Sequence, residues 1–135
     1  LHLKGTTMAK TFKDLVAEGR AVAPMISIDD AEAQMASHPE TIVIDVRQEE
    51  DSHGNAVAGS INIPLGLLPL RADTELPEHY RDARLQDRST PIITTCGAGG
   101  QASLAAKVLH DMGFTNVKIM EGGTTAWKNA GKPIH

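Results

Sequence analysis

Short apolar runs alternate with amphipathic segments along most of the chain, and the runs predict five strands. They are MISI after Pro24, TIVID at 41–45, SINIP at 60–64, PIITT at 91–95 and NVKIM at 116–120. TIVID and PIITT are rich in β-branched residues and lack polar alternation, which is typical of strands buried on both faces of a parallel sheet.

Helical spacing between these runs predicts helices. The expected segments are 8–18 with Gly19 as its stop, 27–37 opened by Ser27 with Asp30, 66–70, 101–112 stopped by Gly113, and 124–130. In 101–112 the positions that follow the helical period are Leu104, Lys107, Val108 and Asp111. Residues 71–90 are charged and interrupted by proline, which favours a surface excursion with one helical turn at 77–85.

Strands that alternate with helices at this spacing form βαβ units. The expected fold is therefore α/β, with a five-stranded, mainly parallel sheet and helices on both faces. At 135 residues the chain fits one domain at 25–135, preceded by an N-terminal extension, 1–24, that carries a short amphipathic helix. This helix is expected to pack on the domain, and a role as a partner or membrane-surface helix is the alternative.

Composition and charge exclude several function classes. The formal net charge is −4 and no Lys/Arg block occurs, which disfavours binding to nucleic acid or to an anionic membrane. The longest apolar stretch, 61–70, is interrupted by Pro64 and Pro69 and is too short to span a bilayer. The six histidines are scattered without ligand spacing, so we expect no metal and no cofactor.

The single cysteine, Cys96, excludes an internal disulfide and fits a reducing compartment, so a cytoplasmic location is expected. The chain begins with Leu1, and Met8 is a plausible native start. A targeting segment that has been removed, and with it a periplasmic location, is therefore the alternative.

Cys96 stands in the segment TTCGAGGQAS, between a predicted strand and a predicted helix. Ligand sites in open parallel sheets lie beyond the carboxyl ends of the strands, where this cysteine falls. We expect Gly97, Gly99 and Gly100 to adopt positive φ and to turn their N–H groups inward as an anion-binding loop. Together with the helix N-terminus, such a loop favours a nucleophilic thiolate. A small core residue beside a tight turn is the alternative.

Four segments together resemble the rhodanese-like domain family, whose members include sulfurtransferases that carry sulfur as a cysteine persulfide. They are IDVRQEED at 44–51, AGSINIP at 58–64, the six-residue loop from Cys96 to Gln101, and EGGTTAWKNAGKPI at 121–134. The resemblance extends over about 27–134.

The resemblance implies that Cys96 takes a sulfane sulfur from a small anionic donor such as thiosulfate, or from a persulfide, and passes it to a thiol or cyanide. A protein persulfide partner is also possible. The backbone amides of the loop would hold the charged sulfur; the loop comprises Gly97, Ala98, Gly99, Gly100, Gln101 and Ala102. Asp45 and Arg47 are expected to be structural partners at the end of the first buried strand.

The main departure from the family pattern is Gln101, where active rhodaneses commonly have arginine. Without that charge, a weaker thiosulfate site is expected, since charged hydrogen bonds contribute about 1 kcal/mol more than neutral ones. The alternative function is a low-turnover or inactive sulfur-carrier or partner-binding module. Phosphatase chemistry is disfavoured, because related phosphatases need a loop one residue longer closed by arginine, and this chain has Ala102 there.

Overall fold

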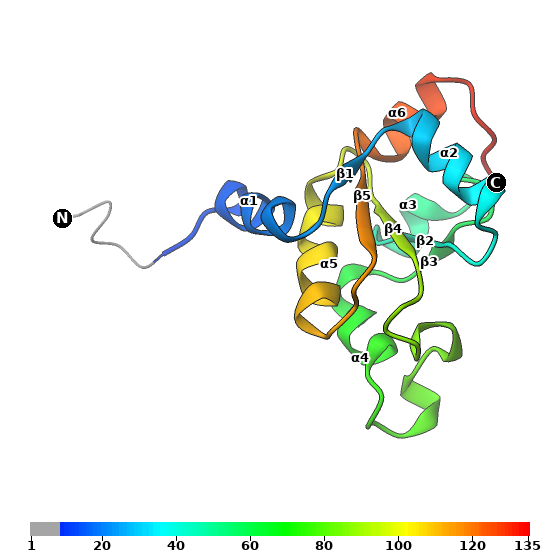
Figure 1. The fold of residues 1–135 in the computed structure, drawn as a ribbon. Helices are drawn as coiled ribbons and strands as arrows, with labels where there is room; N and C mark the ends of the chain where they lie inside the picture. Colours follow the sequence, from blue (N-terminus) through cyan, green and yellow to red (C-terminus); the bar gives the residue numbers. More distant parts are fainter. Residues whose placement is uncertain (1–8) are drawn as a thin grey trace.

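The computed structural model of the protein describes residues 9–135. Five strands form one sheet in the order β1-β5-β4-β2-β3, and every neighbouring pair is parallel (Figure 1). The strands are β1 (Met25–Ile26), β2 (Ile42–Asp45), β3 (Ile61–Asn62), β4 (Ile92–Thr95) and β5 (Val117–Met120). The expected α/β class and the five strands are confirmed.

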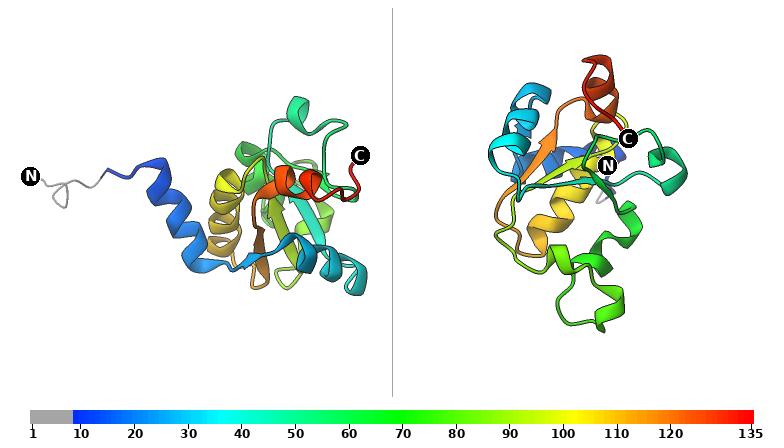
Figure 2. Two further views of the ribbon diagram at one scale, coloured as in Figure 1. Left: turned by 90° about the horizontal axis from the view of Figure 1, so that it is seen from above. Right: turned by 90° about the vertical axis from the view of Figure 1, so that its right-hand side faces the viewer.

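Helices cover both faces of this sheet (Figure 2). The helices are α1 (Phe12–Val22), α2 (Ile28–Ser37), α3 (Glu49–Ser52), α4 (Leu68–Ala72), α5 (Gly100–Asp111) and α6 (Gly123–Asn129). One buried cluster joins the sheet to α4 and α5, and a second, which includes Val43, Ile93 and Trp127, joins it to α2 and α6. Ile42 and Ile44 of β2 belong to the first cluster and Val43 to the second, as the alternation of side chains along a strand requires.

Helix α1 differs from the prediction in both bounds. The expected Met8 lies outside the described residues, and the helix begins after Thr11, whose hydroxyl accepts from the amide of Asp14 while the Asp14 carboxylate accepts from the amide of Thr11. It continues through Gly19 to Val22, so Gly19 is not its stop. A Cβ at Gly19 would lie 2.0 Å from the carbonyl oxygen of Ser103 in α5. Glycine is therefore required at this position, because the two helices approach closely there.

The helix predicted at 101–112 is confirmed as α5, and its buried positions are not the four that follow the helical period. Leu104, Lys107 and Val108 are only half-buried and Asp111 is exposed. The fully buried positions are Ala102, Ser103, Ala105, Ala106 and Leu109. Helix α5 lies between the sheet and α1, so small side chains on two of its faces permit close approach on both sides (Figure 2).

The connecting segments differ from expectation in smaller ways. Strand β1 ends at Ile26, because Ser27 caps α2 by accepting from the amide of Asp30. The predicted helix at 66–70 is a 3₁₀ turn (Leu65–Leu67) followed by α4, and α3 was not predicted. The 71–90 excursion holds two 3₁₀ turns, Glu78–Tyr80 and Ala83–Leu85. Leu85 is fully buried, so this excursion is anchored in the core.

Candidate functional site

Cys96 directly follows β4, which lies between β5 and β2 in the middle of the sheet. Thr95 pairs with Asp45, the last residue of β2, so the cysteine lies at the carboxyl edge of the sheet. The residue is 3% exposed. Its Sγ accepts hydrogen bonds from the backbone N–H groups of Gly99, at 3.0 Å, and Ala102, at 3.3 Å. A cysteine that only fills the core has no need of two aligned amide donors.

Only one of the three loop glycines has the predicted positive φ. Gly99 has φ +110° and precedes the first turn of α5, whereas Gly97 and Gly100 do not adopt that region. The prediction of positive φ was therefore wrong for Gly97 and Gly100. A Cβ at Gly100 would lie 3.0 Å from Cζ of Phe12, and a Cβ at Gly97 would meet open space.

The N-terminus of α6 orients the loop from behind. The amide of Thr124 donates to the carbonyl of Cys96 over 2.8 Å, and that of Thr125 donates to the carbonyl of Gly97 over 3.1 Å. A Cβ at Gly123 would lie 2.7 Å from both carbonyl oxygens. These bonds satisfy the carbonyls of Cys96 and Gly97 with two amides of the first turn of α6. Sequence reasoning missed this role, although two consecutive glycines after β5, beside the end of β4, are a usable signal.

Asp45 and Arg47 form the ion pair expected at the end of β2. The guanidinium Nη2 lies 2.7 Å from Asp45 Oδ2, Nε also donates to the carboxylate, and the Arg47 amide donates to Oδ1. Asp45 is fully buried and the Arg47 side chain is 13% exposed. The hydrogen bond to Asp45 raises the pKa of Arg47 above its usual value, with smaller contributions from the charges of Asp45, Asp51 and Cys96. The guanidinium therefore stays charged beside the cysteine.

A pocket of about 360 Å³ opens over Cys96. It is lined by Phe12, Arg47, Gln48, Asp51, Cys96, Gly97, Ala98, Gly100 and Gln101. Of the predicted site residues, Gly99 and Ala102 contribute amides to Sγ and Asp45 holds Arg47 through the ion pair. Sequence reasoning missed Phe12, Gln48 and Asp51. Gln48 and Asp51 lie within four positions after Arg47, so their place in the sequence indicated that they lie near the site. No feature of the sequence around Phe12 indicated that it reaches the pocket.

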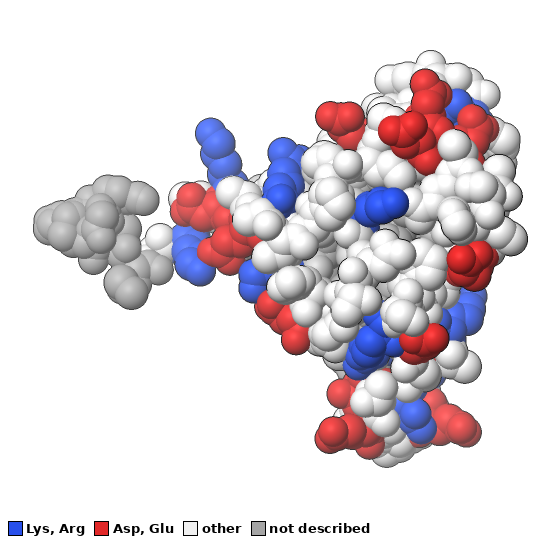
Figure 3. Space-filling view, viewed as in Figure 1, with Lys and Arg blue, Asp and Glu red and all other residues white. Residues whose placement is uncertain are grey.

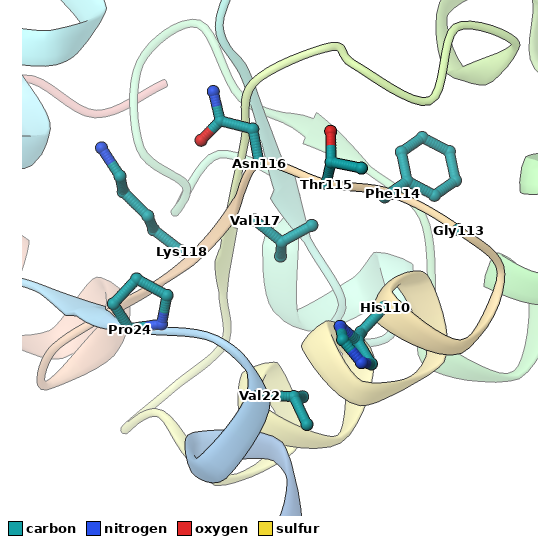
Figure 4. Close-up of a pocket in the computed structure, with 9 residues that line it drawn as sticks. All are labelled: Val22, Pro24, His110, Gly113, Phe114, Thr115, Asn116, Val117 and Lys118. Carbon is teal, nitrogen blue, oxygen red and sulfur yellow. The ribbon is translucent and has the colours of Figure 1, made fainter.

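A larger pocket, of about 470 Å³, lies at the opposite edge of the sheet, around the start of β5. Figure 4 shows Val22 from the end of α1 and His110 from the end of α5 beside Val117 of this pocket. It holds no cysteine, and within residues 9–135 no group of three His, Cys, Asp or Glu side chains could hold a metal ion. The Cys96 pocket, which contains the nucleophilic side chain, is therefore the candidate functional site.

Charged side chains of both signs are interspersed over the face of the molecule shown in Figure 3, including α1 and the 71–90 excursion. This face carries no broad basic patch of the kind that binds nucleic acid. Among the described residues, no helix is long and apolar enough to cross a bilayer.

Comparison with known proteins gives a consistent family assignment. The model of the rhodanese-like domain family matches residues 27–130. A probable 3-mercaptopyruvate sulfurtransferase of Schizosaccharomyces pombe is 29% identical over 92% of this chain and 44% of its own length. The thiosulfate sulfurtransferase PspE of Escherichia coli is 35% identical over 58% of this chain and 67% of its own length. The chain thus spans less than half of the first of these relatives.

Solved structures agree on the fold. A Rhodopseudomonas palustris protein of unknown function, described as a possible tyrosine phosphatase, superposes with a TM-score of 0.84 at 28% identity, covering 97% of this chain and 98% of its own. The human single-domain sulfurtransferase TSTD1 superposes with a TM-score of 0.71 at 22% identity, covering 79% of this chain and 96% of its own.

Proposed function

Because the chain belongs to the rhodanese-like domain family, we propose that it is a sulfurtransferase that carries a sulfane sulfur on Cys96 as a persulfide. The observation that carries this proposal is the sulfur of Cys96, which accepts from two backbone amides at the base of an open pocket. Relatives named as sulfurtransferases support the reaction class.

In the first half-reaction the Cys96 thiolate attacks the outer sulfur of a donor such as thiosulfate. A bond forms between Sγ and that sulfur, the sulfur–sulfur bond of the donor breaks, and its electron pair leaves with sulfite. In the second half-reaction a thiolate or cyanide attacks the outer sulfur of the persulfide and restores the Cys96 thiolate. Sulfur leaving groups are stable anions, so neither step requires a general base.

The loop amides are the groups that would hold the charged outer sulfur. Those of Gly99 and Ala102 already donate to Sγ. Among the contacts of residues 9–135, the amides of Gly97, Ala98, Gly100 and Gln101 donate to no protein acceptor. Donors without a protein partner at a pocket surface are free to bind a ligand anion. Asp45 and Arg47 would act as positioning residues that fix the end of β2 beside this loop.

Two classes of physiological partner fit this proposal: a small sulfur compound and another protein's persulfide. A 34% identical relative is named adenylyltransferase and sulfurtransferase UBA4, and this chain covers 20% of its length. A low-turnover carrier is the second candidate function, and the neutral Gln101 at the pocket favours it. Phosphatase activity is disfavoured by the same loop, which has the buried Ala102 where an arginine clamp would be required.

The test is intact-mass measurement of the purified chain after incubation with thiosulfate. Wild type should gain one sulfur atom and lose it to cyanide as thiocyanate, whereas Cys96→Ser should do neither and should retain its thermal unfolding. Cys96 is the only cysteine in the chain, so sulfur transfer by the serine variant would overturn the mechanism. Loading without steady-state turnover would favour the carrier.

A further inference from the structure

Phe12 is the first residue of α1 and precedes the 27–130 segment that the family model matches, yet it lines the Cys96 pocket. Its ring lies against the active loop, because the Cζ and Cε2 atoms are 3.0 and 3.1 Å from the position that a Cβ of Gly100 would take. The residue is 57% exposed. Phe12 thus presents apolar surface to whatever enters the pocket.

Helix α1 holds this ring in a fixed place. The reciprocal hydrogen bonds of Thr11 and Asp14 set the first turn of the helix at Phe12. Farther along, Gly19 packs against the backbone of Ser103, and Arg20 Nε donates to Ser103 Oγ over 3.3 Å. Ser103 Oγ in turn donates to the carbonyl of Gly99, in the active loop itself. The position of Phe12 is therefore coupled to the loop that carries Cys96.

The other side chains at the pocket offer few favourable charge interactions to an inorganic anion. Arg47 is the only cation among the lining residues, and its guanidinium is engaged by the Asp45 carboxylate and the carbonyl of Asn55. Asp51 adds a negative charge, and Gln48 and Gln101 are neutral. A doubly charged donor has only the backbone amides to bind, whereas a donor with a carbon group can also cover the exposed ring.

We infer that Phe12 is a specificity-determining residue that selects sulfur compounds with an apolar organic group, above all an aromatic one, beside the reacting sulfur. This inference rests on the proposed sulfur transfer and names its substrate class. Contact between aromatic rings favours the aromatic compound by about three- to tenfold over a small alkyl analogue.

Two thiosulfonates of equal charge isolate this contact: methanethiosulfonate and benzenethiosulfonate. With either, the Cys96 thiolate bonds to the outer sulfur, the bond from that sulfur to the sulfonyl sulfur breaks, and the electron pair leaves with the sulfinate. No oxidant or reductant is needed. The donors also differ in intrinsic reactivity, but that difference cancels when wild type and variant are compared.

The experiment measures kcat/KM for both donors, with cyanide as acceptor, in wild type, Phe12→Ala and Phe12→Gln. Both substitutions should lower the ratio of kcat/KM for benzenethiosulfonate to kcat/KM for methanethiosulfonate by about three- to tenfold. Phe12→Gln keeps the length of the side chain and the helix propensity, so a fall in both variants identifies the lost apolar surface. Leu15→Ala is the matched control, because Leu15 is an exposed apolar residue of the same helix that does not line the pocket.

An unchanged ratio in both Phe12 variants, or an equal fall in Leu15→Ala, would overturn the inference and leave the proposed function intact. The absence of sulfur loading on Cys96 from every donor, thiosulfate included, would overturn the proposed function and with it the inference.

Discussion

The backbone N–H of Gly99 donates to Cys96 Sγ over 3.0 Å, and this bond exists because Gly99 adopts φ +110°. An L-residue rarely adopts this conformation, so the glycine is needed for its backbone and not for space: a Cβ there would meet Arg20 Nη2 only at 3.7 Å.

Gly99→Ala should therefore destabilise the fold by about 1–2 kcal/mol through backbone strain. It should also lower kcat/KM for sulfur transfer about tenfold or more, because relaxation of the strain moves an amide donor away from the sulfur. Gly59→Ala is the matched control, since Gly59 has φ +87° with no atom within 4 Å of the added Cβ. Thermal unfolding and steady-state kinetics of both variants check this. Equal loss of activity in the two variants would mean that general destabilisation is the cause.

Gly19→Ala should be strongly destabilising, although alanine is the better helix former by about 1 kcal/mol. The added Cβ would lie 2.0 Å from the carbonyl oxygen of Ser103, and backbone cannot move aside cheaply. We expect a loss of about 1–3 kcal/mol in the free energy of unfolding. Gly66→Ala, whose added Cβ meets no atom within 4 Å, should be close to neutral in the same denaturant titration. A stabilised Gly19→Ala would show that α1 does not pack on α5 as described.

The sequence predicted the strands and the place of Cys96 because both depend on local signals. PIITT forms β4 through its β-branched run, and the glycine-rich segment after it begins α5 within one residue of the expected bound. The same local reasoning assigned Gly19 as a helix stop, although glycine occurs there because Ser103, 84 positions away, comes close. The helical period of 101–112 predicted α5 but did not show which of its positions are buried, since two of its faces are covered.

The site was predictable where chain neighbours build it and unpredictable where distant segments do. Asp45 and Arg47 are two positions apart, and their pairing was expected from the sequence. The contacts of Thr124 and Thr125 with the carbonyls of the Cys96 loop require the β4–β5 pairing, and Phe12 reaches the pocket only through the docking of α1. Neither contact leaves a pattern within one sequence window.

The 71–90 excursion should make stability depend on acid pH. Pairing with Arg84 lowers the pKa of the Asp82 carboxyl below its usual value, and the Asp82 side chain is only 12% exposed. A lowered pKa means that the folded state favours the charged form, so the stabilisation is present above the usual pKa of 3.8 and is lost as pH falls through the lower folded value.

Asp82→Asn should therefore lower the free energy of unfolding by about 1–2 kcal/mol at pH 7, and the difference from wild type should shrink as pH falls through the lowered pKa of Asp82. Urea titrations across that pH range check this. Glu78→Gln, an exposed carboxylate in the same excursion, should change little. A difference that persists unchanged at acid pH would mean that the charge of Asp82 is not what stabilises the turn.

Gln101 is exposed, lines the Cys96 pocket and stands at the end of the six-residue loop, beside the free amides of the first turn of α5. Gln101→Arg would add a cation there, and charge-assisted hydrogen bonds are about 1 kcal/mol stronger than neutral ones. Thiosulfate turnover at low substrate should rise about five- to tenfold, and the gain should shrink as salt screens the new charge. A neutral organic polysulfide should gain much less than the thiosulfate dianion.

Gln48→Arg is the control, because it adds the same charge at the same pocket but outside the loop. It separates a local charge effect from a bidentate contact between the arginine at 101 and the donor. If Gln101→Arg leaves thiosulfate turnover unchanged, or raises turnover of the neutral donor equally, the side chain at 101 does not meet the donor, and its departure from arginine has no bearing on which sulfur compound the pocket accepts.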